Sequence, residues 1–257
     1  MINFLRRIRR DLINENKTSV YLIYAVGEVV LVVFGILIAL GINNWNDQKK
    51  QTKSEFIYYC RVLDDFELDK KRIEELLDKT NERIAISKTI LLDLDSGTKD
   101  KSYLLNQFLP ATRSASFVPR KVTFQDLVSS GNLRLLSDVT IKNSLIQYYS
   151  ELDSKLYQLK QNLDTNINEK FDLLTLSDFG LQEFNYINKL LGPEIIQTLP
   201  HDDWTKDKSS EMYKKFQLLL VFNIAMADRE RVHLSAIKSL MELPYQLLLT
   251  KCKNQGD

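Results

Sequence analysis

The feature that most constrains this chain is an apolar stretch near its start. Residues 20–42 run for 23 residues with one charged side chain, Glu28. As a helix rising about 1.5 Å per residue, the stretch would measure about 34 Å, enough to cross a hydrocarbon core of about 30 Å. Fifteen of these residues are Val, Leu, Ile or Phe, and their gain on insertion, roughly 6 kcal/mol, exceeds the roughly 3 kcal/mol that one central acid costs. We therefore expect a transmembrane helix over residues 20–42.

A cleavable signal peptide is the competing interpretation of this stretch. Ala39-Leu40-Gly41 resembles a cleavage site made of small residues. The apolar run ahead of it, about twenty residues, is longer than the ~7–15 residues usual for a signal peptide. An uncleaved anchor is therefore favoured.

The flanking charges predict the orientation of the span. Five Lys or Arg residues precede it, and three follow closely, Lys49, Lys50 and Lys53. Because basic residues favour the cytoplasmic side, we expect residues 1–19 in the cytoplasm and residues 43–257 outside it.

The first segment also carries an amphipathic pattern. Residues 2–13 place apolar side chains on one helical face and arginines on another. We expect contact with anionic membrane lipids through the arginines of this segment, Arg6, Arg7, Arg9 and Arg10. A disordered basic tail that only sets orientation is the alternative.

Glu28 needs its own explanation, because it would lie about 12 Å into the membrane. Val32, Gly35 and Ala39 share its helical face, and Gly35 and Ala39 form a small-x-x-x-small pair that lets another helix approach closely. We expect this face to contact a second copy of the chain or another membrane protein. A tolerated neutral glutamate and a proton or ion relay remain open.

The sequence after the span predicts an all-α fold. Gly (8) and Pro (5) are few in 257 residues, which favours helices. With Phe56 as heptad position a, nine of the twelve a and d positions up to Leu94 are apolar. Leucines and a tyrosine repeat in 4-3-4-3-4 spacing between Leu145 and Leu163, and a further helix runs over 208–243 until Pro244 breaks or kinks it. We expect the membrane helix to continue into an elongated antiparallel bundle of three long helices.

Two cysteines, Cys60 and Cys252, are present. If the helix containing Cys60 starts at the membrane, three antiparallel passes leave Cys252 at the far end. We therefore expect no intramolecular disulfide.

No chemistry-bearing motif emerges from the sequence. Residues 43–257 carry 30 basic and 31 acidic side chains, which gives no electrostatic reason to expect nucleic acid as a partner. His201-Asp202-Asp203 lacks the further ligands of a metal site, and Ser129-Ser130-Gly131 lacks the flanking glycine of a nucleophile elbow. We expect no catalytic, cofactor-binding or metal site, and no enzymatic activity.

Three sequence segments carry a family resemblance: GEVVLVVFGILIALGINNWN, FQDLVSSGNLRLLSD and LIQYY. They resemble an uncharacterised family of single-pass membrane proteins common in Bacteroidota, whose span reads GExxLVxxGILIALxINNWN. Gly41 departs from that pattern, which has a polar residue there. The resemblance implies an inner-membrane protein with a periplasmic domain, and supplies no catalytic residues.

These features favour a membrane-anchored interaction or scaffold protein that self-associates or joins an envelope complex. A periplasmic helical-bundle sensor is one alternative. The other is an accessory subunit of a proton-coupled transport or motor complex that uses Glu28, by analogy of layout alone.

Overall fold

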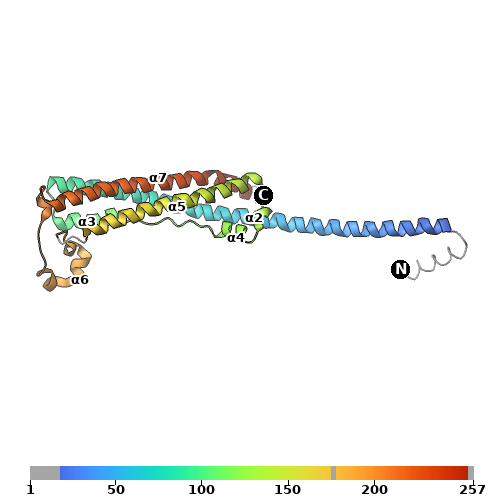
Figure 1. Cartoon of the computed structure of the whole chain (residues 1–257), viewed down its shortest axis with the longest axis horizontal. Helices are drawn as coiled ribbons and strands as arrows, with labels where there is room; N and C mark the ends of the chain where they lie inside the picture. The colour runs from blue at the N-terminus through green and yellow to red at the C-terminus, as the bar shows by residue number, and fades with distance from the viewer. Residues whose placement is uncertain (1–17, 175–177, 254–257) are drawn as a thin grey trace. The chain divides into compact units, whose positions relative to one another are not determined.

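The computed structural model describes residues 18–174 and 178–253, and the regular structure among these residues is helical throughout (Figure 1). The expected all-α class is confirmed. The chain divides into two compact units, unit 1 (Met1–Ile57) and unit 2 (Tyr58–Asp257).

The basic segment lies almost wholly outside the described residues. The predicted lipid contacts of Arg6, Arg7, Arg9 and Arg10 therefore stay predictions.

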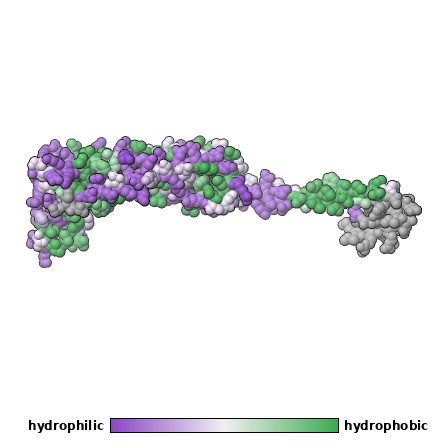
Figure 2. All heavy atoms as spheres, in the orientation of Figure 1, coloured by the Kyte–Doolittle hydropathy of each residue, from purple (hydrophilic) through white to green (hydrophobic). Residues whose placement is uncertain are grey.

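Unit 1 is described as the first part of α2, the helix Thr18–Ser96. Its apolar side chains are exposed, with Ile23 and Leu31 each 74% accessible. Figure 2 shows hydrophobic residues along this part of the helix and hydrophilic residues after them. By length and composition it can cross a membrane, although a signal sequence passes the same test.

Unit 2 is a bundle built on the second part of α2, α5 (Val139–Leu174) and α7 (Glu211–Lys253) (Figure 1). α7 runs antiparallel to the other two helices. Near its end, Cys252 bonds to Cys60 of α2, and just before its start, Lys208 pairs with Asp95 near the end of α2. Phe66 packs on Tyr148, and Asn166 bonds to Asn223 further along. α2 and α5 therefore run in the same direction, contrary to the alternating order expected for three passes.

Between α2 and α5 the chain returns along the bundle in a pass that the sequence did not predict. This return pass consists of α3 (Lys101–Thr112), an extended segment over 113–121, and α4 (Val122–Ser129). An extended chain advances about 3.3 Å per residue, against about 1.5 Å in a helix. Nine extended residues therefore cover about twice the length that nine helical residues would, which lets this short segment run back along the bundle. The segment has no hydrophobic repeat, so the sequence patterns did not reveal it as a pass.

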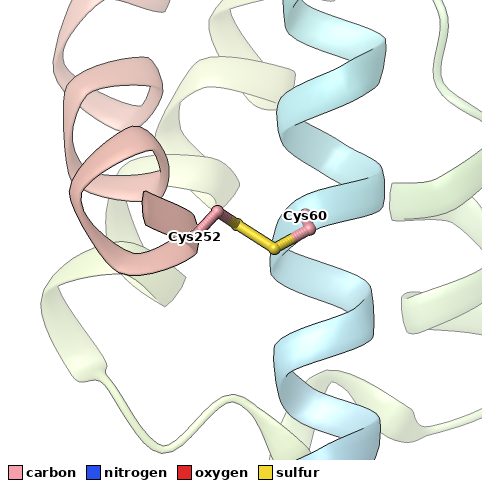
Figure 3. The surroundings of a disulfide bond; sticks show 2 residues. All are labelled: Cys60 and Cys252. Atoms are coloured by element: carbon pink, nitrogen blue, oxygen red, sulfur yellow. A yellow bond between two sulfur atoms is a disulfide. The ribbon is translucent and has the colours of Figure 1, made fainter. Parts of the chain in front are cut away.

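The return pass brings the two cysteines together, and the expectation of no intramolecular disulfide is wrong. Cys60 of α2 and Cys252 of α7 form a disulfide with a Cα–Cα separation of 5.7 Å (Figure 3). Four passes, rather than three, place the end of α7 beside the start of unit 2.

The buried seam of α2 also differs from the predicted one. The predicted d positions are buried, but most of the predicted a positions are only half-buried. The second buried line lies one residue earlier in the heptad, and consists of Val62, Asp69, Leu76, Arg83 and Ile90. Two charged residues in this line hid it from a pattern based on apolar side chains.

Several helices end or begin at residues suited to those positions. Gly97 and Gly131 have positive φ of 65° and 71°, as expected for helix stops. Asp138 Oδ1 accepts from the backbone N–H groups of Thr140 and Ile141 and caps α5. In contrast, α7 continues through Pro244 to Lys253, because the turns after Pro244 pack against the core.

The end of the bundle away from the disulfide is covered by short elements. They are η2 (Leu181–Glu183), α6 (Asn185–Ile196) and η3 (Trp204–Lys206); η1 (Asn132–Leu135) lies instead between α4 and α5. Trp204 Nε1 donates to the Phe179 carbonyl at 3.1 Å, and buried Lys101 donates to the Asp202 carbonyl at 2.6 Å. The Lys101 bond holds the cover onto the start of α3, and the Trp204 bond ties η3 to the segment before η2.

Candidate functional site

The predicted helix-contact face of unit 1 is only partly gathered in the structure. Glu28 and Val32 line a shallow hollow of about 370 Å³ with Ala25, Val29 and Val33. Gly35 and Ala39 do not line this hollow. A Cβ added to Gly35 would meet nothing within 4 Å, so this helix surface is open to a close neighbour. The contact itself stays a prediction.

Unit 2 contains a feature that the sequence did not predict, a polar layer that divides the core. On either side of it, apolar side chains form two separate clusters, one around Phe66 and one around Phe216. The polar layer consists of Thr80, Arg83, Ser87, Ser114, Asn162, Asn166, Asn223 and Glu230, all of them buried except the half-buried Ser114.

An ion pair forms the first half of the layer. Arg83 Nη2 donates to Glu230 Oε2 at 2.6 Å, and their side chains are only 6% and 11% exposed. Arg83 also donates to Ser114 Oγ at 2.9 Å and to Thr80 Oγ1 at 3.0 Å. The pair therefore ties α7 and the extended segment to α2.

An amide network forms the second half. Asn223 Nδ2 donates to Ser87 Oγ and to the Ala111 carbonyl, each at 2.9 Å. Its Oδ1 accepts from Asn166 Nδ2 at 3.3 Å. Buried amides of this kind favour one register of the helices, because any shift would leave them unpaired.

A groove opens beside this layer, with a volume of about 480 Å³. One wall is the extended segment from Ser114 to Pro119, and the opposite wall is α5. Glu230 contributes at the α7 side. The α5 wall consists of Leu156, Leu159 and Leu163, which the heptad pattern placed in a helix seam but which are only half-buried.

The extended wall is fixed at both ends. At one end Ser114 accepts from Arg83. At the other, Arg120 donates from its backbone N–H and its guanidinium to Asp69, at 2.9 and 3.0 Å. Burial raises the pKa of the Asp69 carboxyl, opposed by these bonds from Arg120. The groove is therefore held open by the fold.

Three cations gather beyond the Ser114 end of the groove. Arg83 and Arg113 are two of them, and both act electrostatically on the third, Lys170. Burial, followed by the charges of Arg113 and Arg83, lowers the pKa of Lys170. Glu230 pairs with Arg83, whereas Arg113 and Lys170 make no ion pair with any residue that the structure describes. The cluster carries excess positive charge.

The paired tyrosines Tyr148 and Tyr149 serve the core. Tyr149 stacks on Phe124 at a ring-centroid distance of 4.1 Å, and both tyrosines pack on Phe66. Burial raises the pKa of both phenols. Their hydroxyl groups are buried without a hydrogen-bond partner in the described part of the chain.

The residues of the 201–203 loop serve structure. The Asp202 carbonyl holds Lys101, and the Asp203 side chain caps η3. Within residues 18–174 and 178–253, no three His, Cys, Asp or Glu side chains converge as metal ligands.

Comparison with protein families finds a match to a family of unknown function (DUF6090) over residues 28–177. The chain belongs to this family. Comparison with curated proteins and with solved structures finds no match.

The DUF6090 match begins at Glu28 and extends past α5. It covers the predicted contact face, the extended wall and the α5 wall of the groove. α7, with Asn223, Glu230 and Cys252, lies beyond the matched residues. The carboxylate that pairs with Arg83 and the cysteine that bonds to Cys60 thus come from a part of the chain that the DUF6090 match does not include.

Sequence reasoning missed most of the polar layer for an identifiable reason. Thr80 and Ser87 are two of the three polar residues at the predicted a and d positions, and Arg83 lies at neither kind of position. Asn223 was the available signal, because it stands among apolar residues on a helix face that the structure buries throughout: Met212, Phe216, Leu219, Met226, Leu234 and Ile237.

Proposed function

We propose that this DUF6090 protein is a membrane-anchored interaction protein of the bacterial envelope. In this proposal residues 20–42 cross the inner membrane, the N-terminus is cytoplasmic, and unit 2 is periplasmic. The protein would self-associate, or join a larger complex, through Glu28, Val32, Gly35 and Ala39. It would have no enzymatic activity of its own.

The observation that carries the proposal is the exposure of apolar side chains in unit 1. Leu22 through Ile42 place large hydrophobic side chains at 45% exposure or more, whereas soluble proteins rarely expose continuous apolar surface on this scale. A lipid bilayer removes that surface from water.

The disulfide supports the placement of unit 2. Disulfides persist in oxidising compartments such as the periplasm and are rare in the cytosol. A bond between Cys60 and Cys252 therefore agrees with the orientation that the flanking charges predict.

The first test separates an anchor from a signal peptide. We expect the intact mass of protein purified from membranes to include residues 1–41, and protease added to spheroplasts to digest unit 2. A mature protein starting near Asn43, or a unit 2 protected until lysis, would contradict the proposal.

The second test addresses the contact face by native mass spectrometry. Gly35→Leu should dissociate the oligomer, whereas Gly41→Leu, on the opposite side of the helix, should not. Equal behaviour of the two variants would remove the assigned face. Loss of cellular function in Glu28→Gln with assembly intact would instead favour a proton-coupled accessory role.

A further inference from the structure

The groove in unit 2 combines two properties that are separate along its length. Its walls are mainly apolar, with Phe117, Val118 and Leu234 facing the leucines of α5. Beyond its Ser114 end lies the cluster of Arg83, Arg113 and Lys170. Such a site suits a ligand with an apolar body and an anionic end.

The apolar wall of the groove is a stretch of the α5 seam that the packing of the bundle does not bury completely. Leu156, Leu159 and Leu163 continue the seam that Leu145 and Leu152 begin, but the first three are half-buried and the last two fully buried. The extended segment covers α5 less closely than a helix would. Half-exposed seam leucines on a fixed groove gain free energy if an apolar chain covers them.

The charged part continues the same face of α5. Lys170 follows Leu163 by seven residues, which is two helical turns or about 10 Å. Arg113 precedes Ser114, the groove residue that accepts from Arg83. An anion bound among these cations would offset the cost of keeping Lys170 half-buried without an acidic partner among the described residues.

We propose that this groove binds a single-chain anionic amphiphile, with its alkyl chain along Leu156, Leu159 and Leu163 and its carboxylate or phosphate group between Arg113 and Lys170. Arg83 would add its charge from behind, held in place by Glu230. The volume of about 480 Å³ lies in the lower part of the range for small-ligand sites, roughly 300–1,000 Å³, and accommodates one chain.

The apolar lining favours this ligand over a peptide. An extended peptide could pair with the backbone of 114–119, but its other N–H and C=O groups would be left unpaired against the leucines of α5. The groove is also lined by Lys121, which pairs with Asp153, by Glu230, which pairs with Arg83, and by Lys160 on the α5 side. The charges left without an ion pair among the described residues are therefore positive, which matches an anionic group. This inference concerns unit 2 alone, and it does not depend on the proposed membrane contact face.

Photo-crosslinking of the full chain in phosphatidylcholine nanodiscs tests the proposal. The probes are dodecanoate and dodecyl phosphate carrying a diazirine on the chain, and an uncharged dodecanol analogue. We expect the anionic probes to label peptides containing 114–122 and 156–163, and unlabelled dodecanoate to compete. Comparison of the two anionic probes identifies the preferred head group.

The variants separate the two parts of the site. Arg113→Gln and Lys170→Gln should each weaken labelling by at least about 10-fold, and Leu163→Trp should block the groove. Lys142→Gln, which removes a charge from the first turn of α5, is the matched control and should label normally.

Three results would overturn the proposal. The first is the absence of labelling in either groove peptide. The second is equal labelling by the dodecanol analogue, which would mean an apolar surface open to a peptide or any hydrocarbon. The third is undiminished labelling in both Arg113→Gln and Lys170→Gln while their thermal unfolding matches the wild type.

Discussion

Apolar side chains of the same kinds are exposed in the first part of α2 and buried in the second. In unit 1, Ile36 is 55% exposed, whereas in unit 2 Ile73 is completely buried. The difference lies in what surrounds the helix: unit 2 supplies α5, α7 and the extended segment, whereas the apolar surface of unit 1 remains open within the described chain. The burial of unit 2 is thus explained by its own contacts, whereas no described part of the chain covers the apolar surface of unit 1.

The largest expected effect is a loss of stability, and one matched pair of substitutions compares it between the two parts of α2. Phe66→Ala should lower the free energy of unfolding of unit 2 by about 3–5 kcal/mol, because Phe66 is fully buried. Phe34→Ala, at a residue that is 60% exposed, should leave it unchanged. Denaturant unfolding of the full chain in mild detergent, followed by Trp204 fluorescence in a Trp45→Phe background, measures both. Similar losses would show that unit 1 contributes to the core.

The second expected effect is the loss of stability when a buried carboxylate loses its cation. Arg83→Met leaves Glu230 buried without its cation and should cost about 3–5 kcal/mol of unfolding free energy. The double variant Arg83→Met/Glu230→Leu should recover most of that loss, because no charge remains buried. Glu28→Gln in unit 1 should not affect the same measurement. A double variant no more stable than the single one would contradict this account of the polar layer.

The disulfide gives the next effect in size. Cys252→Ser should lower the stability of unit 2 by about 2–5 kcal/mol, since the bond closes a long loop. Reducing agent should have the same effect on the wild type and none on the variant. If the wild type runs alike on reducing and non-reducing gels and reductant leaves its unfolding unchanged, the bond does not form in the protein.

The smallest effect tests the cap of α5 and its pH dependence. Hydrogen bonds from the Ile141 backbone, with further contributions from Lys251 and Thr140, lower the pKa of Asp138. A lowered pKa means stability that is present above the unfolded value near 3.9 and lost as the pH falls through the folded value. Asp138→Ala should cost about 0.5–2 kcal/mol at pH 7.

Asp138→Asn is the matched control, because asparagine also caps helices but does not titrate here. The difference in unfolding free energy between wild type and Asp138→Asn should shrink as the pH falls toward 3. A difference that stays constant with pH would show that the carboxylate charge contributes nothing at this cap.

The parts of the fold predicted from the sequence were those with a regular apolar repeat. The helix predicted over 208–243 is present as α7, whose face from Met212 to Ile237 is buried throughout, and the repeat between Leu145 and Leu163 lies within α5. Helical periodicity reports burial well where the buried residues are apolar.

The missed features all depend on partners distant in sequence. Arg83 is compatible with burial only because Glu230 lies beside it, and Asp69 only because Arg120 does, at separations of 147 and 51 residues. The extended return pass has no periodicity of its own. Without that pass, neither the disulfide nor the groove could be placed.

The disulfide turns most of unit 2 into a covalent ring that starts at Cys60 and closes at Cys252. A single backbone cut inside the ring, for example in the loop between α6 and α7, leaves both fragments attached to each other. A cut before Cys60, in the hydrophilic residues of α2 that follow the apolar stretch, instead separates the whole bundle from that stretch. Proteolysis at these two places would therefore have opposite outcomes, one a nicked protein whose fragments stay joined and the other an intact bundle without the apolar stretch.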